Sequence, residues 1–307
     1  MQKILVTGAA GFLGQALVGQ LKKEGHEIYV IGHGVTDCYG FDGEIRILGE
    51  EIDFKNLQRL DTSIDTAYHF AGTSSVPVAQ NDPEADRAKS LAPTQILVNY
   101  LENTAPQTCL VYASSAAVYG SAQSESPITE DANLKPISVY GSTKLACENT
   151  IRGSRLNSVI IRFFSIYGAG LRKQLFWDAC NKAQKHDYHF FGAGNAYRDW
   201  IHVQDAIQLL RLVTRNVKEG QKSIYNGANG QRVLVSRALQ LLFDSLGVKS
   251  SPIFDKGQKV GDPTGQCADI GKITALGYRQ TISLEEGLRD YGDWFMRNKI
   301  DPPLVLV

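Results

Sequence analysis

The amino-acid sequence predicts an α/β fold in which helices cover both faces of a doubly wound parallel sheet, followed by a smaller α/β domain. Three observations predict it. Short apolar segments alternate with segments of helical spacing through the first half, a glycine-rich turn follows the first apolar segment, and the alternation loosens after about residue 166. Because no Pro- or Gly-rich linker separates the halves, we expect the second domain to pack on the first.

The elements of the first half follow in chain order. Residues 3–7 are an apolar run that stops at Gly8, as a buried parallel strand does. Apolar residues at positions 12, 13, 16, 17 and 21 have helical spacing, and Gly25 ends this predicted helix. Strands joined by helices predict parallel pairing. The remaining strands are predicted at about 27–31, 45–48, 66–70, 108–113 and 158–163, and the helices at about 84–103 and 139–152.

The second half has fewer and shorter strands. Helical spacing recurs there, and no internal repeat or block of like charge interrupts it. Helices are predicted at about 172–186, 203–217, 236–246 and 284–298, and strands at about 188–191 and 223–226.

The composition argues against several classes of partner. Of 307 residues, 43% are hydrophobic and 21% charged, and Lys plus Arg equals Asp plus Glu at 32 each. This balance predicts no nucleic-acid or membrane partner, and no apolar run approaches the roughly 20 residues that span a bilayer. The five cysteines form no C-x-x-C pair, which indicates free thiols in a reducing cytoplasm. His186 and His189 lack a third ligand, so we expect no metal site.

A glycine-rich turn at residues 7–14 predicts a cradle for the phosphates of a dinucleotide. Gly8 permits a tight turn, Gly11 lets the backbone approach a pyrophosphate, and Gly14 lets the helix pack closely on the sheet. Phe12 and Leu13 open the helix, whose N-terminus offers N–H groups and positive dipole to phosphates. The alternative, an ordinary glycine-rich turn, is disfavoured by the position between the first strand and the first helix.

The end of the second predicted strand indicates which dinucleotide is bound. An Asp or Glu there would hydrogen-bond the adenosine ribose and repel a 2′-phosphate. The sequence instead has Gly32, which leaves space, and His33, which could meet a phosphate or lie in a solvated loop. We therefore expect NAD or NADP, with NADP slightly favoured.

Two further strand ends could contact the cofactor. Phe70, Ala71 and Gly72 end the strand at 66–70, where small residues let a flat cofactor lie against the backbone. Glu50 or Glu51 could reach the adenine amino group, although a solvated pair of acids is an equally good interpretation.

Candidate catalytic residues follow the strand at 108–113. That segment ends in serines, and Tyr140 and Lys144 come downstream at helical positions i and i+4, so they share one helix face. Free tyrosine is a poor base at neutral pH, and a neighbouring ammonium favours its phenolate form. Ser115 could then hold a substrate oxygen while Tyr140 moves its proton. A surface Tyr/Lys pair is the alternative.

At this point the sequence resembles the extended short-chain dehydrogenase/reductase family, in its NAD(P)-dependent nucleotide-sugar epimerase/dehydratase branch. The resemblance extends over nearly the whole chain and is more specific for the family than for the reaction. It rests on the glycine-rich turn and on the motifs at residues 113–120, 140–144, 162–168, 192–194, 198–205 and 284–288.

The resemblance implies a Rossmann domain and a smaller domain that grips a nucleoside-diphosphate sugar. Residues 1–166, with about 198–222 returning, would form the first, and residues 167–197 and 223–307 the second. In such enzymes Ser115, Tyr140 and Lys144 would be the catalytic triad, and Tyr140 and Lys144 would also contact the cofactor.

Substrate contacts are implied at Ser74, Ser115, Ser165, Arg198 and Lys259. Arg198 would pair with the diphosphate, or alternatively form an ion pair with a neighbouring aspartate. The family usually has Asn at the position of Ser165, and often an arginine in the loop that holds Lys259.

The resemblance implies a 4-epimerase that moves a hydride at C4 of the sugar. Dehydratases of this branch place an Asp-Glu pair where this chain has Ala116 and Ala117, so dehydration is not expected. The first alternative is an NADPH-dependent 4-ketosugar reductase or dehydrogenase, and the remote one is a non-catalytic dinucleotide-binding regulator. A homodimer joined through helices 84–103 and 139–152 is also implied.

Overall fold

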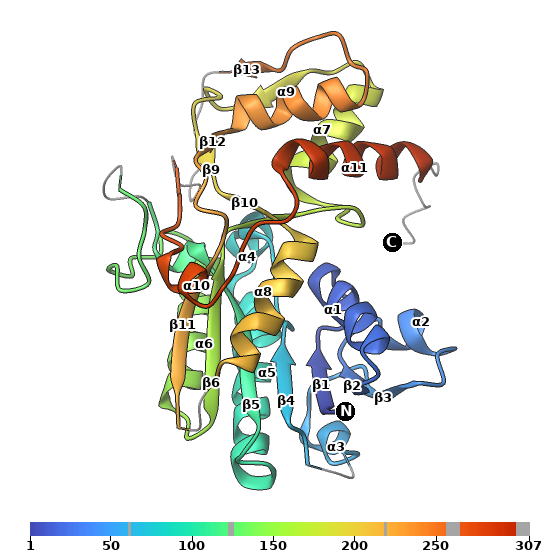
Figure 1. Cartoon of the computed structure of the whole chain (residues 1–307), viewed down its shortest axis with the longest axis vertical. Helices are drawn as coiled ribbons and strands as arrows, with labels where there is room; N and C mark the ends of the chain where they lie inside the picture. Colours follow the sequence, from blue (N-terminus) through green and yellow to red (C-terminus); the bar gives the residue numbers. More distant parts are fainter. Residues whose placement is uncertain (61–62, 122–125, 218–219, 256–264, 299–307) are drawn as a thin grey trace.

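The computed structural model describes residues 1–60, 63–121, 126–217, 220–255 and 265–298. Over these residues, the central sheet has seven strands, all parallel, in the order β11-β6-β5-β4-β1-β2-β3 (Figure 1). The predicted doubly wound Rossmann sheet is therefore confirmed. The strands are β1 (Lys3–Thr7), β2 (Glu27–Ile31), β3 (Ile45–Gly49), β4 (Thr66–His69), β5 (Cys109–Ser115), β6 (Asn157–Phe163) and β11 (Lys222–Gly227).

Helices cover both faces of this sheet. On one face lie α1 (Phe12–Lys23) and α8 (Val203–Arg215), and on the other lie α5 (Pro83–Thr104) and α6 (Val139–Gly153) (Figure 1). Most strands have apolar residues at successive positions because successive side chains point to opposite faces and both faces are covered. In β1, Ile4 and Val6 join the α1/α8 side, whereas Leu5 joins the α5/α6 side.

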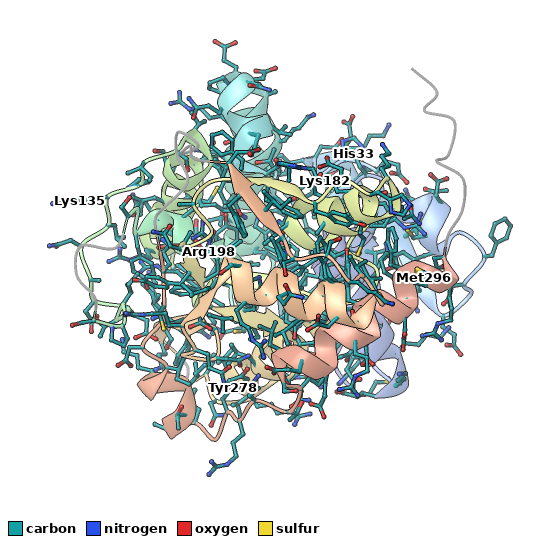
Figure 2. The ribbon with its side chains drawn as sticks, turned by 90° about the horizontal axis from the view of Figure 1, so that it is seen from above. His33, Lys135, Lys182, Arg198, Tyr278 and Met296 are labelled. Carbon is teal, nitrogen blue, oxygen red and sulfur yellow. The ribbon has the colours of Figure 1, made fainter. Side chains whose placement is uncertain are left out.

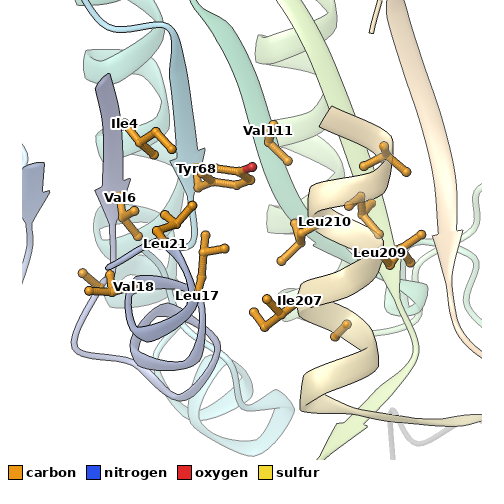
Figure 3. Close-up of a cluster of buried hydrophobic side chains, with 14 of the residues drawn as sticks. Ile4, Val6, Leu17, Val18, Leu21, Tyr68, Val111, Ile207, Leu209 and Leu210 are labelled. Carbon is orange, nitrogen blue, oxygen red and sulfur yellow. The ribbon is translucent and has the colours of Figure 1, made fainter. Parts of the chain in front are cut away.

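The α1/α8 side holds a continuous buried cluster. Burial of each Leu or Ile side chain in this cluster contributes about 1.5–3 kcal/mol to the free energy of unfolding. Figure 3 shows side chains of α1 and α8 meeting those of the strands, with labels on Ile4, Val6, Leu17, Val18, Leu21, Tyr68, Val111, Ile207, Leu209 and Leu210.

A second unit packs beyond the carboxyl ends of the strands. Its helices α7 (Gln174–Gln184), α9 (Val235–Ser245) and α11 (Leu284–Arg297) share one apolar cluster, at the top of Figure 1. Phe12, at the start of α1, packs against that cluster, so the glycine-rich turn touches the second unit. The strands there pair in twos: β7 (Ser165–Tyr167) with β10 (Trp200–His202), β9 (Tyr197–Arg198) with β12 (Val233–Leu234), and β8 (His189–Phe191) with β13 (Ile253–Asp255).

One strand lies elsewhere than the sequence suggested. The sequence predicts the strand at 223–226 in the smaller domain, whereas β11 pairs with β6 and forms the edge of the large sheet. The physical reason is that an apolar run predicts a strand without specifying which sheet it joins.

Several short elements were not expected from the sequence. They have too few residues for a periodic pattern to emerge. They are α2 (Val35–Tyr39), α3 (Phe54–Leu57), α4 (Val76–Asn81), α10 (Gly271–Ala275) and the 3-10 helix η1 (Ala116–Val118). In the described ranges, we find no helix with both the length and the apolar character needed to cross a membrane.

Candidate functional site

The strand order places a topological switch point at the carboxyl ends of β1 and β4, where open α/β sheets form their ligand crevice. These strands are neighbours in the sheet, yet the chain leaves β1 toward α1 on one face and leaves β4 toward α5 on the other. In open α/β sheets, ligands bind outside the strands at such a switch point. The glycine-rich turn follows β1, residues 70–72 follow β4, and Ser115 is the last residue of the neighbouring β5.

The glycines of the turn are required by backbone contacts. Gly8 has φ of 64°, and a Cβ there would lie 2.7 Å from the Ala71 nitrogen. A Cβ at Gly14 would lie 2.3 Å from the Gly8 carbonyl oxygen and 2.7 Å from the Ala9 Cα. Backbone cannot yield as a flexible side chain can, so these positions exclude larger residues. The predicted roles of Gly8 in a tight turn and of Gly14 in close packing agree with these distances.

The start of α1 is open toward the crevice. Gly11 is exposed and precedes the helix without a side-chain cap, so the first N–H groups retain their hydrogen-bonding capacity. Phe12 and Leu13 direct their side chains into apolar clusters instead, Phe12 into the second unit and Leu13 into the α1/α8 side. The arrangement suits an anion held by backbone groups.

A buried histidine fixes the loop after β4. Thr7 Oγ1 lies 2.7 Å from His69 Nδ1, and His69 Nε2 lies 2.9 Å from Thr94 Oγ1, which donates to the Ser90 carbonyl oxygen at 2.7 Å. Thr94 must therefore accept a hydrogen bond from the Nε2–H group, and Nδ1 accepts one from the Thr7 hydroxyl. Thr7 in turn accepts from the Ala71 N–H at 3.3 Å. This chain of bonds ties residues 70–72 to the end of β1.

The structure brings the segments of Ser115, Tyr140 and Lys144 together. Ser115 ends β5, and its Oγ accepts from the Ala117 N–H at 3.2 Å. A Cβ at Gly141 would lie 2.5 Å from the Ala117 carbonyl oxygen, so the first turn of α6 packs directly on η1. Lys144 Nζ lies 5.8 Å from the centre of the Tyr140 ring. The helix thus presents Tyr140 and Lys144 on one face, as their spacing predicted.

Lys144 is held by two further groups. Its ammonium donates to the Ala113 carbonyl oxygen at 3.0 Å and lies 4.9 Å from the centre of the Tyr112 ring. The side chain is buried. A fixed positive charge therefore stands behind Tyr140.

A buried ion pair lies behind these residues. Arg162 Nη2 donates to Glu148 Oε2 at 2.8 Å, and Ser114 Oγ donates to Glu148 Oε1 at 2.5 Å. Burial alone would lower the pKa of Arg162, but the hydrogen bond and charge of Glu148 outweigh it and raise that pKa. Because Glu148 lies on α6, Arg162 on β6 and Ser114 on β5, the network fixes α6 relative to the strand that ends in Ser115.

The predicted substrate contacts lie on several elements. Ser165 is on β7 and its N–H donates to the Asp199 carbonyl oxygen at 3.0 Å, which holds it close to Arg198 on β9. Ser74 Oγ accepts from Lys173 Nζ at 2.5 Å. Lys259 lies outside the described residues.

The aspartates near Arg198 make other bonds. The Asp199 carboxylate accepts from the N–H groups of Asn229 and Ala268, and burial raises its pKa to about 6. Asp205 accepts from the N–H groups of Thr281 and Ile282. Arg198 itself donates to the Tyr197 carbonyl oxygen at 2.9 Å. Seen from above, Arg198 and His33 lie well apart (Figure 2), so they belong to different parts of the site.

A pocket of about 510 Å³ lies beside the glycine-rich turn. Residues 169–173 line part of this pocket, and no sequence motif indicates them as site residues. Gln174, which follows them, has φ of 67°, a backbone conformation that non-glycine residues rarely adopt and that often marks functional segments. No sequence pattern identifies this strain. The pocket is lined by Ala10, Phe12, Gln15, Ala16, Ala169, Gly170, Leu171, Arg172, Lys173, Val203 and Gln204.

These features define the class of protein: an α/β protein of Rossmann type with a dinucleotide crevice and a serine, a tyrosine and a lysine beside it. The family model described as "NAD dependent epimerase/dehydratase family" matches residues 4–228. The chain therefore belongs to this family, and the resemblance stated from its motifs is confirmed.

Two curated relatives match this chain along nearly their whole length. The chain is 28% identical to an uncharacterized UDP-glucose epimerase of Bacillus subtilis, over 93% of this chain and 95% of the relative. It is also 28% identical to a bifunctional UDP-glucose 4-epimerase and UDP-xylose 4-epimerase of Arabidopsis thaliana, over 97% and 96%.

Solved structures agree in fold. One is MoeE5 in complex with UDP-glucuronic acid and NAD, with a TM-score of 0.86, 27% identity, and coverage of 96% of this chain and 99% of that one. Another is the UDP-glucuronic acid 4-epimerase of Bacillus cereus in complex with UDP-glucuronic acid and NAD, with a TM-score of 0.86, 25% identity and the same coverage.

Proposed function

We propose that the chain is an NAD-dependent nucleotide-sugar 4-epimerase acting on a UDP-hexose. One observation carries the proposal: Lys144 stands beside Tyr140 on a helix whose first turn packs on the segment following Ser115. The names of the relatives and of the solved complexes support UDP and NAD as ligands.

The residues of the crevice fit a dinucleotide. Glycine is required at positions 8 and 14 by backbone contact, and the uncapped start of α1 offers N–H groups to a pyrophosphate. Ala71 and Gly72 give the flat cofactor a small-residue surface, and Lys144 would contact its nicotinamide ribose. When bound, NAD accepts a hydride from the sugar carbon and returns it.

The side chains of this chain would manage the proton and the oxygen. Ser115 Oγ accepts from the Ala117 N–H, which leaves its own hydroxyl proton for a sugar oxygen. Tyr140 takes the proton of the sugar hydroxyl and later returns it to the same oxygen. The charge of Lys144, 5.8 Å from the centre of the Tyr140 ring, would stabilise the negative charge that develops on the reacting oxygens.

Substrate specificity would come from the second unit and from the segment that follows β4. Arg198 suits the diphosphate because a guanidinium forks onto phosphate oxygens. Ser74 and Ser165 would contact the nucleotide sugar, and Lys259 is proposed for the diphosphate from the sequence alone. Ala116 and Ala117 have no acid or base to offer, which argues against elimination of water.

The test is turnover with defined sugars. The purified protein, supplied with NAD, is incubated with UDP-glucose, UDP-galactose and UDP-glucuronic acid, and the sugars are separated by chromatography. We expect the 4-epimer to accumulate without net change in reduced-nicotinamide absorbance. Net change in that absorbance would replace the proposal with the 4-ketosugar reductase or dehydrogenase alternative.

A hydroxyl deletion separates catalysis from binding. Tyr140→Phe should lower turnover by roughly 10²–10⁴-fold while NAD binding persists. Tyr225→Phe, on β11, is the matched control and should keep wild-type turnover. Unchanged turnover in Tyr140→Phe would mean that the protein does not use this residue for proton transfer, and dinucleotide binding without any turnover would favour the regulator alternative.

We further propose that two copies associate through α5 and α6, which lie together on one face of the sheet (Figure 1). Four helices from two copies would then form a bundle. Light scattering coupled to gel filtration tests this assignment, and a monomeric mass would contradict it. The division into a dinucleotide domain and a substrate domain is likewise proposed, with β11 moved to the first.

A further inference from the structure

The turn after β2 contains a carboxylate that comes from another strand. Glu50 directly follows β3, and its Oε2 accepts from the Gly34 N–H at 2.6 Å, while its Oε1 accepts from the Thr36 N–H at 2.9 Å. The carboxylate therefore lies in the loop that follows β2, which is the position where the adenosine ribose of a Rossmann dinucleotide is recognised.

The backbone explains why the acid does not come from β2 itself. Gly32, the first residue after β2, has φ of 126°, and a Cβ there would lie 3.3 Å from the Gly8 nitrogen. An Asp or Glu at position 32 would be strained whatever the space around it. The Gly32 N–H donates to the Gly49 carbonyl oxygen at 3.0 Å, which brings the residue preceding Glu50 against this turn.

We infer that Glu50 is the residue that selects NAD over NADP, by taking the place of the acid that is missing from the end of β2. The inference rests on the proposed dinucleotide site. It reverses the slight preference for NADP that the sequence suggests, because that preference rests only on the residues that directly follow β2.

Two effects of Glu50 act against a 2′-phosphate. The carboxylate already uses the N–H groups of Gly34 and Thr36, so a phosphate at this turn would lose those donors. Its negative charge would also repel the phosphate at short range. A ribose 2′-hydroxyl, in contrast, could donate to a carboxylate oxygen.

The carboxylate is ionised under ordinary conditions. The Thr36 side chain and N–H, the Gly34 N–H and the nearby His33 together keep the pKa of Glu50 below its usual value, against the opposing effect of desolvation. His33 is exposed, and its ring interacts with the charge of the Glu50 carboxylate. A phosphate that contacted His33 would therefore also meet the negative charge of Glu50.

The experiment compares the binding of NAD and NADP at constant ionic strength, by calorimetry on the full-length protein. The wild type should bind NAD at least about tenfold more tightly than NADP, a difference of about 1.4 kcal/mol. Glu50→Gln keeps an acceptor oxygen but removes the charge. It should tighten NADP binding roughly tenfold and change NAD binding by less than about threefold.

Glu51→Gln is the matched control. Glu51 is the adjacent acid and is exposed, so its substitution should leave the NAD/NADP ratio at the wild-type value. Thermal unfolding of both variants checks that the fold is retained. Glu50→Ala, which frees the two N–H groups as well, should tighten NADP binding further.

Three outcomes would overturn the inference. These are equal affinity of the wild type for NAD and NADP, an unchanged ratio in both Glu50 variants, and an equal change in Glu51→Gln. A wild type that binds neither dinucleotide overturns both this inference and the proposed function. NAD selectivity that depends on Glu50, in a protein without epimerase turnover, supports the inference and overturns the proposed reaction alone.

Discussion

The ammonium of Lys144 lies 5.8 Å from the centre of the Tyr140 ring, and it is fixed there by a hydrogen bond of 3.0 Å to the Ala113 carbonyl oxygen. The bond joins α6 to β5 two residues before Ser115. One side chain thus connects the strand that carries the serine with the helix that carries the tyrosine. The position of the ammonium is a consequence of this connection.

Removing that charge should slow the reaction without unfolding the protein. Lys144→Met preserves most of the buried stem, and we expect kcat to fall by roughly 10²–10⁴-fold. The measurement is a pH–rate profile for UDP-sugar epimerisation.

Lys135→Met is the control for this substitution. Lys135 projects away from the molecule (Figure 2), so the variant should keep the wild-type profile. If Lys144→Met also kept the wild-type profile, the lysine would have no role beyond packing.

Two glycines of α1 should respond oppositely to alanine. In Gly14→Ala, the new Cβ meets backbone atoms of Gly8 and Ala9, so we expect destabilisation by about 1–3 kcal/mol and a loss of dinucleotide binding. A Cβ at Gly19 would meet nothing within 4 Å, and Gly19→Ala should stabilise the helix by up to about 1 kcal/mol. Urea unfolding and NAD titration measure both effects. Equal behaviour of the two variants would contradict the close packing of α1 on the turn.

The buried pair of Arg162 and Glu148 should be costly to break. Arg162→Met leaves the Glu148 carboxylate buried without its partner, and we expect a loss of about 3–5 kcal/mol in unfolding free energy. Replacing both residues by Met should cost less than the single change, since no charge is then left buried. Arg155→Met, which removes an exposed pair with Glu102, should cost less than about 1 kcal/mol. Equal losses from the buried and exposed pairs would show that burial does not govern this interaction.

The sequence predicts the large elements because their signals are local. The strand at residues 3–7 is apolar on both faces, and the helix at 84–103 is long enough to be read despite Pro93 within it. The glycine-rich turn is recognisable because its glycines are required by the backbone, as Gly14 illustrates. The Tyr140 and Lys144 pair follows from helical spacing alone.

Other features depend on which strands become neighbours, and no local pattern reports that. Glu50 reaches the turn after β2 only because β3 pairs with β2, so its contact with Gly34 could not be predicted. The same reason explains why the sequence does not indicate that β11 joins the edge of the large sheet. Lys173 contacts Ser74 across a separation of 99 residues, and nothing in either segment indicates it.

The last prediction concerns the buried ring of His69. Burial lowers the pKa of His69 to about 3, with a smaller contribution from the charge of Lys144, whereas an unfolded chain has a histidine pKa of about 6.5. Below about pH 6.5 the unfolded state therefore binds a proton that the folded state does not. The folded state loses stability as the pH falls through this range, by about 1.4 kcal/mol per pH unit down to about pH 3.

Unfolding free energies at pH 7 and pH 5 measure this loss. His69→Gln lacks the titrating ring, so the loss between the two pH values should be smaller than in the wild type by about 2 kcal/mol. His189→Gln, whose parent side chain is 57% exposed, should retain the wild-type dependence. If His69→Gln lost as much stability as the wild type, the ring would have to be protonated in the folded protein. The bonds from Thr7 to Nδ1 and from Nε2 to Thr94 would then be assigned wrongly, because a protonated ring has no acceptor nitrogen to offer Thr7.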